Sequence, residues 1–189
     1  LSEAKIDRAD LSDADLSDAN LSGADLNKSN LGGANLQHAY LRRADLRGAN
    51  LSGTNLTKAN LRECALFKTW LKKADCSEAN LQNIKGAQAH MQDSVFKRAK
   101  LEGADLSGAR LDGVNFEDAG LQTANLSRAN LKGANLNQAD LRGANLRYVV
   151  GLTKEQIELA QIDKRTLLPD YLKIKWASET QYEIIDNKG

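Results

Sequence analysis

Few side chains in this sequence are of the kinds that perform chemistry. His38 and His90 are the only histidines, and they are the natural candidates for a general base or a metal ligand. A thiolate nucleophile would have to come from Cys64 or Cys76. Near the N-terminus, four aspartates stand close enough in sequence to hold a calcium ion weakly: Asp10, Asp13, Asp15 and Asp18. Whether any of these groups converge depends on the elements that position them.

A five-residue period positions the side chains of residues 1–150. Every fifth residue from 1 to 146 is leucine at 24 of 30 positions, and every fifth from 4 to 149 is alanine at 22 of 30. The residue between them is Asn or Asp at 19 of the 29 positions from 5 to 145. Because such a period fits neither a helix nor a strand, the chain must turn at regular intervals, with Ala and Leu inside. This regular self-similarity predicts a solenoid.

The repeated unit resembles the pentapeptide-repeat family, whose motif is A(D/N)LXX. Two clear copies are Ala19-Asn20-Leu21-Ser22-Gly23 and Ala104-Asp105-Leu106-Ser107-Gly108. The resemblance implies an all-β solenoid in which four units form one square coil and the coils stack into a right-handed quadrilateral β-helix. Residues 1–150 would then form about 7.5 coils of twenty residues. We expect this domain to be followed by a short C-terminal helical cap and tail at residues 151–189.

The signals of a helix begin where the period ends, after residue 150. Residues 153–156, Thr-Lys-Glu-Gln, form a capping-box pattern, and Leu152 and Ile157 occupy the positions of a hydrophobic staple. We therefore expect a helix that begins at Lys154 and lies over the end of the rod. Pro169 forbids a long continuation of this helix.

The two ends of the rod differ in their expected cover. Residues 173–189 mix apolar and charged side chains, which leaves three alternatives open: packing on the rod, pairing as a strand, or binding a second chain. The N-terminus carries no comparable segment, and a β-helix exposes apolar core and strand edges at an uncovered end. The N-terminus is therefore the end at which we expect either end-to-end self-association or further residues that precede this sequence.

With twenty residues per coil, the candidate reactive groups do not meet. His38 and His90 fall in different columns more than two coils apart, so they form neither a metal pair nor a general-base partnership. Cys64 and Cys76 occupy inward positions and are expected to be buried thiols. The N-terminal aspartates leave a weak calcium site open as an alternative, although the period itself generates such rows. Since an enzyme needs convergent groups in a concavity, we expect no catalysis, no cofactor and no metal.

Charge and hydropathy narrow the class of partner. Lys and Arg number 26 against 25 Asp and Glu, so nucleic-acid binding is not indicated. No apolar run approaches the roughly 20 residues that span a bilayer, and no signal segment opens the chain, so we expect a cytoplasmic protein without a membrane span. Some pentapeptide-repeat proteins imitate DNA and protect type II topoisomerases such as gyrase. That alternative is disfavoured, because residues 1–150 contain 18 acidic and 20 basic side chains rather than a large acidic excess.

The clearest candidate surface lies near one corner of the fourth coil. It combines two outward aromatic residues with nearby cationic groups: Phe67, Trp70, Arg47 and His90. Exposed aromatics beside cations are typical of protein-binding hot spots. Alternatively, Trp70 covers the irregular coil at 81–100 and stacks on His90 for local stability; that coil is itself compatible with a functional interruption, a junction of two arrays or drift. We interpret the protein as a non-catalytic structural or interaction module that presents a rod-like surface to an unidentified protein partner.

Overall fold

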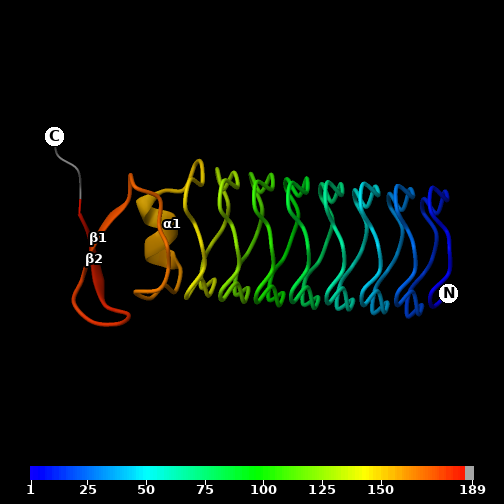
Figure 1. Cartoon of the computed structure of the whole chain (residues 1–189), viewed down its shortest axis with the longest axis horizontal. Helices are drawn as coiled ribbons and strands as arrows, with labels where there is room; N and C mark the ends of the chain where they lie inside the picture. The colour runs from blue at the N-terminus through cyan, green and yellow to red at the C-terminus, as the bar shows by residue number, and fades with distance from the viewer. Residues whose placement is uncertain (186–189) are drawn as a thin grey trace.

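The computed structural model describes residues 1–185 and shows a straight rod of stacked coils (Figure 1). The N-terminus lies at one end of the rod and a small hairpin at the other. Parallel bridges join a residue in each side of a coil to the residue twenty positions later, from Lys5 with Asp25 to Asn130 with Val150. Four such columns of bridges run along the rod, one for each side of the square. The predicted right-handed quadrilateral β-helix is therefore confirmed.

The repeats that carry Asn or Asp share one turn chemistry, which the repeat at Asn30 illustrates. The Asn30 Oδ1 atom accepts the N–H of Gly32 at 3.2 Å, and the Ala34 N–H donates to the Leu31 carbonyl at 3.0 Å. The short side chain of Asn or Asp is suited to this bond to the backbone two residues later. The residue before each inward alanine has a positive φ, which is +70° at Gly33. Glycine is favoured there because it adopts this conformation without strain.

The axis of the rod is filled by the repeating apolar side chains. The inward leucines of residues 21–146 are at most 1% exposed. Phe96 and Phe116 lie one coil apart with ring centroids at 5.4 Å and an angle of 31° between the rings. In the irregular coil, a Cβ added to Gly86 would lie 3.2 Å from the Leu106 side chain, so there is no room for a leucine. Ile84, which is 1% exposed in an alanine position, supplies the missing volume, and the coil persists.

The first coil is less well covered than the others. Its inward side chains Ile6, Leu11 and Leu16 are only partly buried, because no coil lies over them in the structure. Leu1 is exposed. Self-association through this end stays a prediction.

Helix α1 spans Lys154–Leu159 and packs over the other end of the rod. The predicted capping box is present: the Thr153 N–H donates to Gln156 Oε1 at 2.7 Å, and the Gln156 N–H donates to Thr153 Oγ1 at 3.3 Å. Ile157 is fully buried beneath the helix. The predicted start at Lys154 is therefore confirmed. Within residues 1–185, no helix has the length and apolar character needed to cross a membrane.

Pro169 does not end this helix, because α1 stops ten residues earlier and the chain returns to the coil. Gln161 pairs with Asp140, and Leu167 pairs with Asn145, in parallel bridges that extend two of the four columns. The boundary expected at residue 150 marks the end of the five-residue period, whereas the pairing between coils continues beyond it.

Beyond the last coil, strands β1 (Lys173–Trp176) and β2 (Tyr182–Ile185) form an antiparallel hairpin. Alternate side chains pack against the core, and they are Ile174, Trp176, Tyr182 and Ile184. The Tyr182 hydroxyl donates to the Ile157 carbonyl at 3.0 Å, which ties β2 to α1. Of the alternatives left open for residues 173–189, strand pairing and packing therefore both hold for residues 173–185. Residues 186–189 lie outside the described part of the chain.

Candidate functional site

The N-terminal aspartates are engaged in turns. Asp10 Oδ1 accepts the Ser12 hydroxyl at 2.7 Å, and Asp15 Oδ1 accepts the Ser17 hydroxyl at 2.7 Å. These bonds from the serine hydroxyls are the largest cause of a lowered pKa at both carboxyl groups. Across residues 1–185, no three His, Cys, Asp or Glu side chains are grouped to hold a metal ion. Asp10 and Asp15 thus serve the repeat's own turn chemistry, whereas Asp13 and Asp18 stand at the turn position with positive φ.

The two cysteines are buried and reduced. The Cys64 Sγ–H donates to the Leu41 carbonyl, with 2.8 Å between sulfur and oxygen. Burial raises the pKa of the Cys64 thiol to about 12 and raises the pKa of Cys76 as well. Because the thiolate is the reactive species, these side chains act as small apolar residues of the core.

The two histidines lie apart and in different surroundings. His38 is exposed on a turn, whereas His90 is half-buried in the column of bridges that joins Trp70, His90 and Arg110. The Trp70 and His90 rings are stacked, with centroids 4.1 Å apart and 10° between the planes. Burial is the main cause of a lowered His90 pKa, and the positive charge of Arg110 adds to it. The Nδ1 atom of His90 is buried, without a hydrogen-bond partner in the described residues.

Both predicted aromatic residues are exposed, but each has a neighbour on its ring. Trp70 remains 49% exposed beside the stacked His90, and Phe67 is 39% exposed. The Lys68 ammonium lies 5.1 Å from the centroid of the Phe67 ring, which is within the range of a cation–π contact. The expected stack of Trp70 on His90 therefore exists, and it leaves about half of the indole in solvent.

Arg47 is held by a carboxylate on the neighbouring side of the coil. Its Nε atom donates to Asp45 Oδ1 at 2.8 Å, and its Nη2 atom donates to Asp45 Oδ2. The bond from the Arg47 guanidinium is the largest cause of a lowered Asp45 pKa. Arg47 thus presents a guanidinium that is already partly neutralised.

Two shallow hollows follow one another along the corner that carries Arg47 and Phe67. The first has a volume of about 320 Å³ and is lined by Asn27, Lys28, Arg47, Gly48, Phe67 and Lys68. The second has a volume of about 400 Å³ and is lined by Lys68, Gln88, His90, Gly108 and Arg110. The structure therefore brings Arg47 and Phe67 into one hollow and His90 into the next, while Trp70 lines neither. Lys68 separates the two hollows and lines both.

Sequence reasoning missed Lys28, Lys68 and the two glycines, although a signal was present. Residues 28, 48, 68, 88 and 108 stand twenty apart, so they form one column at one corner of the rod. Along that column, Gly48 and Gly108 alternate with longer side chains. The hollows lie where the glycines leave the column without a side chain.

The corner formed by residues 7–8, 27–28 and every following pair to 147–148 is here called the basic corner. This corner contains one acidic residue, Asp7, and six cationic residues: Arg8, Lys28, Arg47, Lys68, Arg128 and Arg147. Of these cations, only Arg47 makes an ion pair with any residue of the described chain. The basic corner therefore carries positive charge that is not neutralised by carboxylates of the described residues.

Half a coil away, the corner formed by residues 17–18, 37–38 and every following pair to 137–138 is here called the paired corner. All three of its cations bind an acid one coil further along: Lys58 with Glu78 at 3.8 Å, Lys97 with Glu117 at 2.9 Å, and Arg98 with Asp118 at 3.6 Å. Stacked coils can therefore neutralise a corner within the protein, and the basic corner departs from that arrangement.

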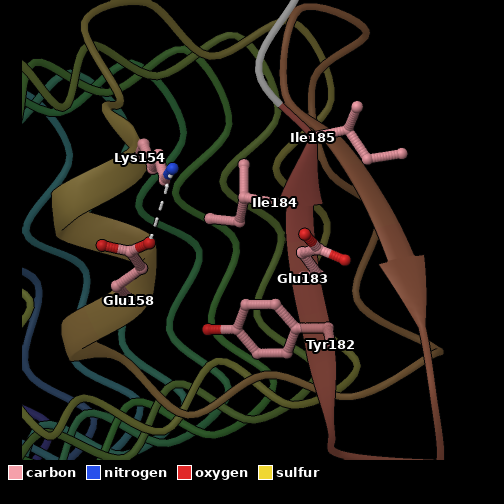
Figure 2. Close-up of a pocket in the computed structure, with 6 residues that line it drawn as sticks. All are labelled: Lys154, Glu158, Tyr182, Glu183, Ile184 and Ile185. Carbon is pink, nitrogen blue, oxygen red and sulfur yellow. Dashed lines mark ion pairs between the residues drawn. The ribbon is translucent and has the colours of Figure 1, made fainter.

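A further hollow, of about 700 Å³, lies at the C-terminal end. Figure 2 shows Lys154 and Glu158 of α1 on one side and Tyr182 and Ile184 of β2 pointing toward the helix from the other. Lys154 Nζ lies 3.9 Å from Glu158 Oε1, so these opposite charges are matched within the helix. The Tyr182 hydroxyl, which also lines this hollow, is bound to the Ile157 carbonyl.

Comparison with known proteins places the repeats in a family. The profile described as Pentapeptide repeats matches eight copies over residues 1–33, 29–66, 74–118 and 124–150. A similar solved structure is HetL from the cyanobacterium Nostoc, a pentapeptide repeat protein involved in heterocyst differentiation regulation. The two sequences are 29% identical, the match covers 89% of this chain and 86% of HetL, and the TM-score is 0.41. Another is QnrB1, a plasmid-mediated fluoroquinolone resistance protein, with 19% identity, 90% of each chain covered and a TM-score of 0.47. No curated protein matches the chain. The extent of the repeat match shows that the chain belongs to the pentapeptide-repeat family.

Proposed function

We propose that this protein is a non-catalytic structural module whose basic corner, with Trp70 on the adjoining side, docks a protein partner. One observation carries the proposal. In the repeats from residue 21 to residue 150 the exposed large apolar side chains are Tyr40, Phe67, Trp70, Tyr148 and Val150. Of these, Phe67 lines one of the two hollows, and Trp70 lies within one repeat of it. Exposed aromatic side chains next to cations are the usual anchors of protein interfaces. The function is the display of a surface, not turnover.

The distribution of reactive groups supports a role without catalysis. The thiols are buried, the two histidines are separated, and the carboxylates of Asp10 and Asp15 serve turns. Acid–base or nucleophilic catalysis needs such groups within hydrogen-bond distance of one another and of a substrate. In the described residues, the hollows of the basic corner offer cations and one imidazole instead.

A second candidate function is topoisomerase protection by imitation of DNA, but the charge pattern argues against it. Duplex DNA carries one negative charge per about 1.7 Å of its axis, so a mimic needs a continuous acidic surface. The basic corner runs along the repeats with six cations against one acid. QnrB1 is described as a fluoroquinolone resistance protein, and its similarity to this chain is in the repeat fold. Docking of a protein partner is therefore the function that we favour.

Site-specific photo-crosslinking in the source cell tests the proposal. We would place p-benzoylphenylalanine at Phe67, where it extends an aromatic ring that is already exposed, and at Ser77 of the paired corner as a control. We expect one protein to be crosslinked from position 67 and not from position 77, and its yield to fall in a Trp70→Ala background. Equal crosslinking from both positions, or none from position 67, would contradict the proposal.

A further inference from the structure

We propose that the two hollows of the basic corner form one groove that binds an acidic, extended segment of the partner protein. This inference rests on the proposed function and specifies the chemistry of the segment that docks. The groove runs from Lys28 to Arg110 along the direction in which the coils stack. Four observations support it: the shape of the corner, its length, its charge and the state of its aromatic rings.

The shape of the groove comes from glycine at a position that accepts other residues. Lys28, Lys68 and Gln88 occupy the same column as Gly48, and their φ values of +57°, +56° and +57° are close to the +65° of Gly48. A Cβ added to Gly48 would have only one close neighbour, Lys28 Cγ at 3.6 Å. The backbone and the space therefore both tolerate a side chain at 48. Glycine there leaves an open notch between Lys28 and Lys68.

The length of the groove matches a short extended peptide. Stacked coils repeat at the spacing between strands, about 4.8 Å, so the four coils from Lys28 to Arg110 span about 19 Å. An extended chain rises about 3.3 Å per residue, so about six residues cover this distance. Alternate side chains of such a peptide point the same way. About three of them would face the groove, one for each of the unpaired cations Lys28, Lys68 and Arg110.

The charge of the groove is available for a partner. Lys28, Lys68 and Arg110 are exposed and make no ion pair with any described residue. A carboxylate that docks on them therefore breaks no ion pair, whereas at the paired corner it would have to displace Glu78, Glu117 or Asp118. Complementary charge of this kind raises the rate of association and fixes the register of the bound segment.

The aromatic rings favour a peptide over a nucleic acid. Single-stranded nucleic acids bind by stacking bases on open aromatic faces. Here His90 is stacked on Trp70, and Lys68 lies over Phe67. The row on one side of the corner also holds Asp25, Asp45 and Asp105, together with Lys85. Asp45 is paired with Arg47, and Asp25 and Asp105 repel phosphates beside this narrow cationic line. A narrow peptide avoids these acids, and a leucine or aromatic side chain can pack on the free edge of Phe67.

The test is a binding measurement with defined probes and the full chain. The probe is a labelled peptide of about ten residues in which glutamate alternates with serine around one central leucine, and binding is followed by fluorescence anisotropy. Controls are the same peptide with lysine in place of glutamate and a single-stranded oligonucleotide. We expect the acidic peptide to bind, its affinity to fall as salt is added, and neither control to bind.

Two matched pairs of variants locate the binding. Lys68→Glu reverses a charge in the groove, and Lys73→Glu makes the same change five residues later, at the next corner. Gly48→Gln fills the notch without a change of charge, and Gly53→Gln adds the same side chain where nothing lies within 4 Å of a Cβ. We expect the groove variant of each pair to weaken peptide binding about tenfold or more, and its partner less than about twofold. Thermal melting of all four variants separates lost binding from lost folding.

The inference would be overturned by failure of the acidic peptide to bind, by binding of the oligonucleotide instead, by equal effects within either pair of variants, or by salt-independent binding. Concentration-dependent dimerisation that Lys68→Glu abolishes would assign the groove to acidic residues of a second copy and would equally overturn it.

Failure of the proposed function can be distinguished from failure of this inference. Crosslinking from Phe67 to a partner whose crosslinked segment is not acidic would leave docking intact and reject the acidic occupant. Peptide binding without any crosslink in the cell would reject the cellular role and leave the groove's chemistry intact.

Discussion

The basic corner and the paired corner lie diagonally opposite on the same coils and share one backbone. Their turn residues have nearly identical φ values, +56° at Lys68 and +59° at Lys58. Yet one corner binds every cation to an acid one coil further on, and the other leaves five of six cations without a carboxylate. The repeat therefore determines where an outward side chain stands but not what it is. Function in such a rod has to reside in the choice of outward residues.

The largest expected effect tests the core that both corners share. Leu56→Asp places a carboxylate on the dry axis, where Leu56 is 0% exposed, and a buried unpaired charge costs several kcal/mol. We expect loss of the cooperative thermal transition, measured by circular dichroism. Asn55→Asp is the matched control, because it puts the same group one residue away on the outside, where Asp15 and Asp75 already stand in that column. A normal melt of the Leu56 variant would contradict the inward register of the repeat.

Most of the fold was predictable because inward positions are chemically restricted. Leucine and alanine at a fixed spacing of five are all buried only if the chain coils with that period, so the coil was predicted correctly. Thr153 and Gln156 form a capping box, so the start of α1 was predicted correctly as well. The return of the chain to the coil at Gln161 was missed, because residues 151–168 no longer keep a spacing of five.

The candidate surface was less predictable, because outward positions accept many residues. Phe67, Trp70 and Arg47 stand out by type, whereas a lysine such as Lys68 is ordinary in a sequence with 26 basic residues. Lys68 becomes a candidate binding residue because Gly48, next to it in the column, has no side chain and because no carboxylate of the described residues pairs with its ammonium group. Absences of this kind become visible only after residues twenty apart are set side by side.

The next effect in size separates a docking role of Trp70 from a structural one. Trp70→Ala removes the stack on His90, and such ring pairs contribute about 0.5 to 1.5 kcal/mol beyond burial. We expect a loss of about 1 kcal/mol in the free energy of unfolding by urea denaturation, while Tyr40→Ala, which removes a ring that is 54% exposed in another column, should cost less. A loss above about 3 kcal/mol would assign Trp70 to the stability of the coil instead.

A smaller effect comes from turning the basic corner into a paired one. Gln88→Glu places a carboxylate one coil beyond Lys68, in the relation that Lys58 has to Glu78. We expect a gain of about 0.5 kcal/mol in the free energy of unfolding, since exposed ion pairs contribute little, together with weaker binding of the acidic peptide. The two readouts should move in opposite directions. If peptide binding is unchanged while stability rises, the charge of Lys68 has no part in docking.

The smallest expected effect is a pH dependence on the side next to the basic corner, where the half-buried His90 is stacked on Trp70. The pKa of His90 is lowered from 6.5, by burial first and by Arg110 second, so the folded state binds fewer protons than the unfolded state just below that value. Stability therefore rises with pH through this window and is lost as the pH falls from about 7.5 to 5.5. The lowered carboxyl pKa values, such as that of Asp45, act at more acidic pH and do not contribute here. We expect the melting temperature to decrease slightly over this range in the native chain and to change less in His90→Gln, which keeps a polar side chain against Trp70. The same slope in both proteins would show that the imidazole beneath Trp70 is not the titrating group.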